Sequence, residues 1–477
     1  MSRWRVVWAL AAVSCALWAA PEARADVKLP ALIGSNMVLQ QGRPVRVWGT
    51  ADPGERVVVR VKNQQKVTTA GETGAWQVRL GPLDAGGPFE MTIEGKNRIA
   101  LRNVMAGEVW VCSGQSNMWW PVEFSANSRQ EIAEASYPKI RLFAVGLKAT
   151  ADPQRDVQGQ WVECNPKTVG GFSAVSYFFG RQLHQALGVP VGLIHSSVGG
   201  TPAEAWTSMS ALVADPDFRE ILGRWSKGPA KPEFFTSTYL YNGMIAPLTP
   251  YGIRGAIWYQ GESNADRAYQ YRKLFPAMIA DWRKAWRQGD FPFLFVQLAN
   301  FTEVQKDASA PSAWAELREA QLMTLSLPNT AMAVTMDIGD AADIHPKNKQ
   351  EVGWRLAQAA LGTVYGRKVP YSGPIYESMA AEEGKIRLRF THAAGLRTDW
   401  LGKPRGFAIA GADQKFVWAE AKIDGDTVLV SSDKVTSPVA VRYGWANNLV
   451  CTLYNGAGLP ASPFRTDDWP GATVDRR

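Results

Sequence analysis

Histidine and cysteine are both scarce in this chain of 477 residues, which contains four of each. The cysteines form no CxxC pair and no cluster with histidine at metal-ligand spacing, so we expect neither a metal site nor a cofactor. Three cysteines lie beyond residue 25, which is too few for a disulfide framework, and at most one bridge can form. These are Cys112, Cys164 and Cys451, of which Cys112 is interpreted as a packed thiol in a buried strand.

Long hydrophobic runs are missing too, apart from one at the N-terminus. Arg3 and Arg5 precede an apolar run over residues 6–20, and the small-x-small sequence Ala23-Arg24-Ala25 follows it. This order is typical of a secretory signal peptide, here residues 1–25, whose apolar core is too short to span a bilayer. The sequence therefore predicts a periplasmic or secreted protein without membrane insertion.

Blocks of basic residues are absent although the formal net charge is +8. The chain has no Lys/Arg run, no basic repeat and no aromatic-rich RNA motif, so nucleic acid is not expected as a partner. Charged residues make up an ordinary 20% of the chain, and the positive balance bears on solubility rather than on fold.

What is present divides the chain into three parts. Residues 26–105 carry short alternating runs broken by glycine and proline, the rhythm of a β-sandwich-like domain. Residues 106–370 alternate strands with helices, which predicts an α/β domain with a mostly parallel sheet wrapped by helices. Residues 371–477 return to β-type alternation, and the sequence leaves open whether this region packs on the N-terminal β domain.

The predicted elements of the middle part follow from apolar runs and from helical periodicity. A polar stretch over residues 208–238 interrupts them and is interpreted as an insertion near the site. The predicted strands are 109–113, 191–195, 255–259, 291–298 and 330–337, and the predicted helices are 172–187, 269–286, 314–327 and one that Pro346 opens.

Ser116 is the candidate nucleophile. The apolar run that begins at Val109 breaks at Gly114 into small polar residues, which predicts a strand-to-helix turn that carries Ser116. In a parallel sheet such a turn lies at the carboxyl edge, where ligands bind and where backbone N–H groups are close to the serine hydroxyl.

His345 is the candidate base among the four histidines. His184 lies in a predicted helix and His392 in a charged β run, so both are interpreted as surface or interface residues. His195 ends a predicted buried strand and stays an alternative base. His345 lies in a polar loop after the last predicted sheet strand, beside Ser116, where a base can reach the hydroxyl proton.

Three carboxylates compete to orient His345. Asp343 shares a tight loop with it, although this residue could instead cap the helix that follows. Asp340 lies five residues before the histidine and needs a longer excursion. Glu262 has the reach, but a role in positioning the substrate or Gln260 is an equal alternative. We favour Asp343, with Glu262 next.

Four sequence blocks in order carry a resemblance to a known family. Gly114-Gln115-Ser116-Asn117-Met118 resembles the first block of the sialate O-acetylesterase-like branch of the SGNH (GDSL-type) hydrolases. The strings over residues 197–206 and 258–264 resemble its second and third blocks, and the Asp343-x-His345 pair resembles its last block. The family more often has Asp-x-x-His, and here Ala342 stands at that earlier position.

The resemblance implies an SGNH-hydrolase-like fold and an oxyanion hole. Its donors would be the Ser116 N–H, the glycine N–H groups of Gly199 and Gly200, and the side-chain amide of Gln260. Removal of one such donor typically costs about 10²- to 10³-fold in rate. The general family pattern has Asn where this chain has Gln260.

The implied activity is a secreted or periplasmic carbohydrate O-acetylesterase, in which Ser116 forms an acetyl-enzyme from an acetylated oligo- or polysaccharide without a cofactor. Sialic acid carries a carboxylate that needs a basic clamp, and the sequence shows no pair of basic residues suited to it. This absence favours a neutral plant cell-wall polysaccharide of the xylan or xyloglucan type, with sialate O-acetylesterase as the alternative.

Two rival functions are weaker. A non-catalytic glycan-binding protein would have no use for a serine, a histidine and oxyanion donors at family spacing. A lipase or thioesterase needs an apolar channel, whereas no lid helix rich in Leu and Phe is evident near Ser116. The tryptophans near the blocks suit a sugar platform better; they are Trp119, Trp120, Trp206 and Trp258.

Overall fold

The structure is a computed structural model that describes residues 26–225, 228, 230–399 and 402–476. The signal peptide predicted over residues 1–25 lies outside this part of the chain. Within the described ranges, no helix combines the length and the apolar character that a membrane span requires.

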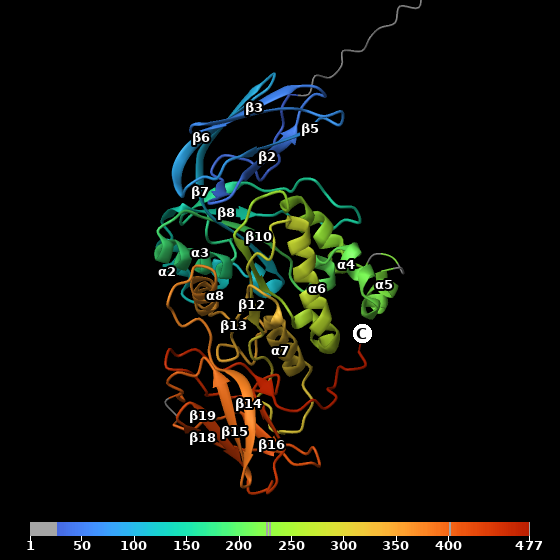
Figure 1. The fold of residues 1–477 in the computed structure, drawn as a ribbon, viewed down its shortest axis with the longest axis vertical. Coiled ribbons are helices and arrows are strands. Elements are labelled where there is room, and N and C mark those ends of the chain that lie inside the picture. The colour runs from blue at the N-terminus through green and yellow to red at the C-terminus, as the bar shows by residue number, and fades with distance from the viewer. Residues whose placement is uncertain (1–25, 226–227, 229, 400–401, 477) are drawn as a thin grey trace, which may run out of the picture.

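The middle of the molecule is a sheet with the strand order β13-β12-β11-β7-β10-β8-β9 (Figure 1). Its neighbours are parallel except for β8 and β9 at the edge, which confirms the predicted α/β class. The strands are β7 (Arg98–Gly114), β8 (Tyr137–Ala144), β9 (Trp161–Cys164), β10 (Val191–Ser197), β11 (Gly255–Tyr259), β12 (Phe293–Gln297) and β13 (Thr330–Val334).

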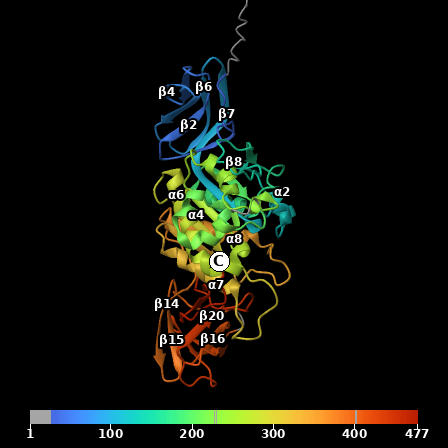
Figure 2. The same cartoon turned by 90° about the vertical axis from the view of Figure 1, so that its right-hand side faces the viewer.

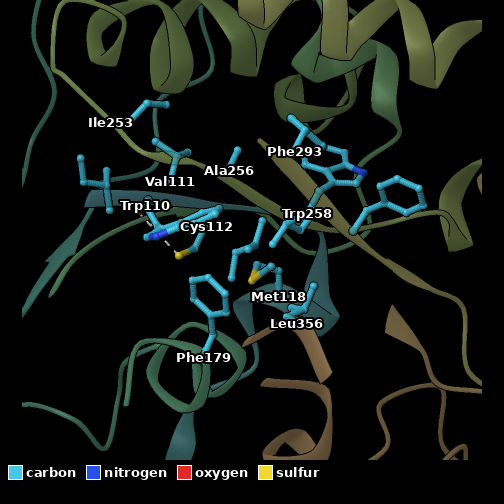
Figure 3. Packing of buried hydrophobic residues seen from close by; sticks show 14 of the residues in the cluster. Trp110, Val111, Cys112, Met118, Phe179, Ile253, Ala256, Trp258, Phe293 and Leu356 are labelled. Atoms are coloured by element: carbon cyan, nitrogen blue, oxygen red, sulfur yellow. Dashed lines mark hydrogen bonds between the residues drawn. The ribbon is translucent and has the colours of Figure 1, made fainter. Parts of the chain in front are cut away.

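Helices cover both faces of this sheet. α3 packs against α8 on one side, and α6 packs against α7 on the other (Figure 1). Figure 3 shows the resulting core, in which Trp110 and Cys112 of β7 point towards Phe179 while Val111 points to the opposite face. The indole of Trp110 packs edge-on against the Phe179 ring, and the two ring centroids are 5.1 Å apart. The helices are α3 (Ala174–Leu187), α6 (Ala268–Trp286), α7 (Ala313–Met323) and α8 (Lys349–Thr363).

Strand β7 joins the N-terminal β domain to the central sheet. Its first half pairs with β6 and β1, and its second half pairs with β10 and β11. The domain boundary predicted at residue 105 therefore falls inside one continuous strand. The N-terminal strands are β1 (Val38–Gln40), β2 (Val45–Thr50), β3 (Arg56–Val61), β4 (Gln64–Thr69), β5 (Ala75–Leu80) and β6 (Gly86–Glu94).

The C-terminal β region consists of two four-stranded sheets, with the orders β14-β15-β19-β18 and β17-β16-β20-β21. Most of its buried apolar residues belong to the same hydrophobic core as the central sheet, whereas Ala408, Ala410, Phe416 and Ala440 belong to a second, smaller cluster. The strands are β14 (Ile375–Glu382), β15 (Lys385–Thr391), β16 (Phe407–Ala410), β17 (Val417–Trp418), β18 (Glu420–Asp424), β19 (Thr427–Ser431), β20 (Ala440–Tyr443) and β21 (Phe464–Arg465).

The two β regions lie at opposite ends of the molecule, as both Figure 1 and Figure 2 show. The C-terminal region therefore does not pack on the N-terminal β domain. The position of the C-terminal region is explained in part by Arg318 of α7, which is fully buried. The Arg318 guanidinium donates to the carbonyls of Ala446 and Asn447 in that region. Gln297, which ends β12, likewise donates to Ser462 at 3.0 Å. These contacts hold the C-terminal region at the carboxyl edge of the sheet.

Two local predictions need correction. The edge strands β8 and β9 were not expected, because exposed Pro138 and Lys139 stand near the start of β8 and β9 has only four residues. The last helix begins at Lys349 rather than at Pro346. Its cap is Asn348, whose side chain accepts from the Glu351 backbone at 3.2 Å, so Asp343 does not cap this helix.

Candidate active site

Ser116 lies on a tight turn between β7 and the short helix α1 (Ser116–Trp119). The turn needs glycine at residue 114, where φ is +143° and an added Cβ would lie 2.1 Å from the Tyr259 carbonyl oxygen. The Gln115 N–H donates to the same carbonyl at 3.0 Å. Strand β11 therefore fixes the turn, and Ser116 is presented at the carboxyl edge of the sheet as expected.

The structure brings Ser116 and His345 into contact. The distance between Ser116 Oγ and His345 Nε2 is 2.9 Å. The indole of Trp120 stacks on the imidazole, with ring centroids 4.8 Å apart and planes 15° apart. Asn117 donates to the Ile344 carbonyl at 3.0 Å, which ties α1 to the loop that carries the histidine. Trp120, directly after α1, thus positions the imidazole, and Asn117 of α1 holds the loop that carries it.

Among the three competing acids, Asp343 faces the imidazole. Its Oδ1 lies 3.3 Å from His345 Nδ1 and accepts from the His345 backbone N–H at 2.8 Å. Asp340 instead accepts from the Ala342 backbone, and Glu262 accepts from Asn117 at 2.6 Å. The carboxylate of Asp343 is 40% exposed, so solvent screens part of its charge.

The pKa of His345 is lowered from its ordinary value, chiefly because burial disfavours the imidazolium. The attraction of Asp343 opposes this shift, and the positive charge of Lys349 adds to it. A lowered pKa keeps Nε2 unprotonated at neutral pH, which is the state that a general base requires.

Backbone donors surround the serine. Gly199 packs against Ser116 so closely that an added Cβ would lie 3.5 Å from the serine Cβ. Within the described part of the chain, the N–H groups of Ser116, Gly199 and Gly200 have no acceptor. Of the two glycines, Gly199 lies against Ser116, whereas a Cβ on Gly200 would face the Phe235 ring. The oxyanion hole, in which fixed dipoles stabilise developing charge, stays a prediction.

Gln260 is placed differently from the expectation. Its side chain is fully buried, and its amide nitrogen donates to the Thr201 carbonyl at 3.2 Å and to Asn264 at 2.7 Å. Its Oε1 accepts from the Tyr271 hydroxyl at 2.9 Å. Both amide hydrogens of Gln260 therefore already donate to other residues of the protein. To bind an oxyanion, Gln260 would have to give up one of these two hydrogen bonds.

A buried network behind His345 was missed in the sequence. Lys349 is fully buried, and its Nζ donates to Oδ1 of Asn117, while the amide nitrogen of Asn117 donates to Glu262. Burial lowers the pKa of Lys349 to about 7, against the opposing charges of Glu262 and Asp343. A weak signal was present in the sequence, since Lys349 falls in the first turn of the helix predicted from Pro346, where a positive charge is unfavourable with the helix dipole.

Glu262 completes this network without touching His345. Its Oε2 is inaccessible to solvent and has no hydrogen-bond partner among the described residues. Burial raises the pKa of Glu262, although the hydrogen bond from Asn117 and the charge of Lys349 oppose the rise. Of the two roles left open for Glu262, the geometry therefore favours positioning over that of the acid.

His195, the alternative base, pairs with another serine. Its Nε2 lies 2.5 Å from Ser197 Oγ, and burial lowers the pKa of His195 to about 4.

The predicted sugar platform is smaller than expected. Trp206 and Trp258 are fully buried core residues, whereas Trp119 is 46% exposed beside the nucleophile.

The fold and the site together define a class: an α/β serine hydrolase that presents Ser116 at the carboxyl edge of a parallel sheet to a histidine from a loop after the last strand. Residues 106–362 match the family described as carbohydrate esterase, sialic acid-specific acetylesterase, and the chain belongs to this family. The protein is accordingly a carboxylic ester hydrolase.

Individual relatives match over nearly the whole chain. The chain is 32% identical to the sialate O-acetylesterase of Homo sapiens, over 95% of this chain and 96% of that protein. It is 31% identical to the enzyme of the same name from Rattus norvegicus, over 91% and 93%. A solved structure of a novel carbohydrate acetylesterase from Xanthomonas citri is 40% identical, with a TM-score of 0.87 and coverage of 93% and 100%.

Proposed function

We propose that this protein is a secreted or periplasmic carbohydrate O-acetylesterase that works through an acetyl-enzyme on Ser116. The observation that carries the proposal is the 2.9 Å contact between Ser116 Oγ and His345 Nε2, next to free backbone N–H groups. A nucleophile, a base and preorganised donors at one point are what acyl transfer needs.

The reaction follows from this arrangement. Ser116 Oγ attacks the acetyl carbonyl carbon while His345 Nε2 takes the hydroxyl proton, and Asp343 stabilises the imidazolium that forms. The N–H groups of Ser116 and Gly199 receive the oxyanion. The sugar oxygen then leaves with the proton from His345, so the acetyl group stays on Ser116. Water attacks this ester with His345 again as base, which releases acetate and restores the serine.

Neutral polysaccharide of the xylan or xyloglucan type is the substrate that we favour. A sialic acid carboxylate calls for a charged clamp, and Lys349 cannot supply one, because its Nζ is buried and donates to Asn117. Exposed aromatic rings lie near the nucleophile instead, with Trp119 at 46% exposure and Phe124 at 51%. Such rings stack on the apolar faces of sugars.

Sialate O-acetylesterase is the second candidate, because the family description and the mammalian relatives carry that name. The deciding experiment measures acetate release from acetylated xylan, from acetylated xyloglucan and from O-acetylated sialic acid at equal acetyl concentration, with Ser116→Ala as the blank. Faster release from a plant polysaccharide supports the proposal. Faster release from sialic acid overturns this substrate and leaves the acetylesterase intact.

Two further measurements test the remaining parts. Hydrolysis of p-nitrophenyl acetate should be much faster than that of the octanoate ester, since a lipase would show the reverse order. Export is tested by expression of the full chain and N-terminal sequencing of the periplasmic or secreted product. We expect the sequence to begin at Asp26, directly after the predicted cleavage site. An intact Met1 on the exported protein would contradict the signal peptide.

A further inference from the structure

A groove of about 670 Å³ lies where the N-terminal β domain meets the catalytic domain. Strands β2 and β5 form one wall, and residues 28–30, 155–156 and Pro250 complete it. A second hollow of about 230 Å³ adjoins it, because Arg46 and Pro250 line both. The end of α6 lines this second hollow, below β2 and β5 in the view of Figure 1.

The charge of this double groove is strongly one-sided. Six basic side chains line it, whereas Asp156 is its one carboxylate, and the Asp156 Oδ1 already accepts from the backbone of Ala31 and Val157. Arg43 donates to Gln288 and to the Ile253 carbonyl. The basic residues are Lys28, Arg43, Arg46, Arg79, Arg155 and Arg287.

Four of these arginines have no partner in the described protein. Arg46 and Arg79 lie directly opposite each other on β2 and β5, and Arg287 faces them from the end of α6. No hydrogen bond or ion pair within the described ranges involves the side chains of these three residues or of Arg155. Burial lowers the pKa of Arg46, and the charges of Arg79 and Arg287 lower it further, so these three like charges repel one another until an anion enters the cluster.

Aromatic side chains lie beside the arginines. Trp48 follows Arg46 by two residues on the same face of β2, and its half-buried ring lines the larger hollow. Trp76 also borders this hollow, but its side chain is only 4% exposed and packs in the hydrophobic core, so Trp48 is the ring that a sugar can reach. An indole face suits a sugar ring, and a guanidinium pair suits a carboxylate in two parallel hydrogen bonds.

We propose that this groove is a second saccharide site, which binds a carboxylate-bearing oligosaccharide with a sugar face on Trp48 and its carboxylates on Arg46, Arg79 and Arg287. The site is separate from Ser116. Pro250 precedes β11 and Arg287 precedes β12, so the groove lies at the amino edge of the parallel strands, whereas Ser116 lies at the carboxyl edge. The five residues of β11 alone span roughly 16 Å between these edges.

The separation gives the groove an anchoring role. An acidic polysaccharide bound in the groove tethers the enzyme to that polymer. Meanwhile another polysaccharide chain, or another part of the same polysaccharide, enters the acetyl site at Ser116. Binding at the groove is therefore expected to be independent of turnover, and the two can be measured apart.

The test is calorimetric titration of the mature protein with a hexameric oligogalacturonate and with the same hexamer fully methyl-esterified. The two ligands share the same sugar backbone, but the ester replaces each carboxylate by an uncharged methyl ester. We expect the free acid to bind at least about tenfold more tightly than the ester, and its affinity to fall as salt rises. Equal binding of both ligands, or no binding of the acid, would overturn the proposal without the need for any variant.

Variants locate the site. The double variant Arg46→Ala/Arg79→Ala should weaken binding of the free-acid hexamer by at least about tenfold. Trp48→Ala should weaken binding of both the free-acid and the esterified hexamer. The matched control is Lys385→Ala/Arg389→Ala, which removes the same charge from exposed β15 at the other end of the molecule and should leave affinity unchanged. Equal losses in the two double variants would show a general charge effect and contradict the site. The exposed single variant Arg79→Ala replaces the double variant if that one fails to fold.

Two more measurements separate this inference from the rest. A deoxythymidine hexamer tests the nucleic acid alternative, and its tighter binding would overturn the saccharide class. Hydrolysis of p-nitrophenyl acetate should stay within about twofold of wild type in every groove variant, because the groove lies at the far edge of the sheet. Loss of this activity together with binding would show that the two sites are not separate.

Discussion

The Nζ of Lys349 donates to the Oδ1 of Asn117, and the amide nitrogen of that asparagine donates to Glu262 and to the Ile344 carbonyl. One side chain on the nucleophile helix thus connects the turn after β11, the loop of His345 and the start of α8. A buried ammonium is costly unless it is paired, and here its hydrogen-bond partner also holds the catalytic loop.

Removal of the Lys349 charge should change the pH profile of the reaction. In the proposed mechanism the neutral imidazole of His345 is the base, so kcat/KM should fall as the pH drops through the pKa of His345, which burial lowers from 6.5. The charge of Lys349 contributes to that lowering, so Lys349→Met should raise the pKa of His345. The acid limb of kcat/KM for p-nitrophenyl acetate should move to higher pH. Lys347→Met, two residues away and exposed, is the control and should not shift the limb.

The Lys349 prediction fails if the acid limb of Lys349→Met stays in place or moves to lower pH. A purely structural role would lower kcat at every pH without any shift of the limb. Lys349→Arg should keep most of the wild-type profile if charge is what matters, since a guanidinium stays positive throughout this range.

Ser116→Ala should abolish deacetylation while the protein stays folded. Loss of a serine nucleophile costs roughly 10⁴- to 10⁶-fold in kcat, because the remaining site can only bind and polarise the ester. The measurement is kcat on p-nitrophenyl acetate, with circular dichroism to check the fold. Ser197→Ala is the matched control, since Ser197 contacts His195 and not His345. More than a few per cent of activity left in Ser116→Ala would refute the acetyl-enzyme.

Asp343→Asn should lower kcat through loss of the carboxylate that faces His345 Nδ1. A buried triad acid replaced by its amide loses about 10⁴-fold, and we expect a smaller loss, roughly 10²- to 10³-fold, because Asp343 is 40% exposed. The Glu262 carboxylate contacts Asn117 rather than His345, so Glu262→Gln should change kcat much less than Asp343→Asn does. Both constants, kcat and KM, are measured on one acetyl ester. A larger kcat loss in Glu262→Gln than in Asp343→Asn would reverse the assignment.

Gly114→Ala should destabilise the fold at the nucleophile turn. The added Cβ would lie 2.1 Å from the Tyr259 carbonyl oxygen at a φ of +143°, which predicts a loss of more than about 2 kcal/mol in the free energy of unfolding. Gly188→Ala is the control, because its φ of +72° is also positive but nothing lies within 4 Å. That change should cost only about 1 kcal/mol. Urea unfolding of both variants provides the comparison, and equal losses would show that the clash is relieved.

Much of the catalytic domain could be predicted because its signals are local. The strands β10 and β11 begin at the predicted residues, since strands buried on both faces begin as continuous apolar runs. Residues that act through distant partners could not be placed. The side chain of Gln260 forms hydrogen bonds with Tyr271 and Thr201, and the residues next to Gln260 in the sequence do not indicate these contacts. Trp206 and Trp258 read alike as core or as sugar platform until the packing of α6 buries them.

The sequence by itself determined the order of strand, turn and loop that carries Ser116 and His345, because a glycine break and a scarcity of histidine are visible without any long-range contact. Only the tertiary structure decided which acid faces the imidazole, that Lys349 is buried behind it, and that the two β regions lie at opposite ends. Those outcomes depend on contacts between residues far apart in the chain, such as Asn117 with Lys349 and Arg318 with Ala446. Side-chain periodicity records which face of an element is buried, but it does not record what buries it.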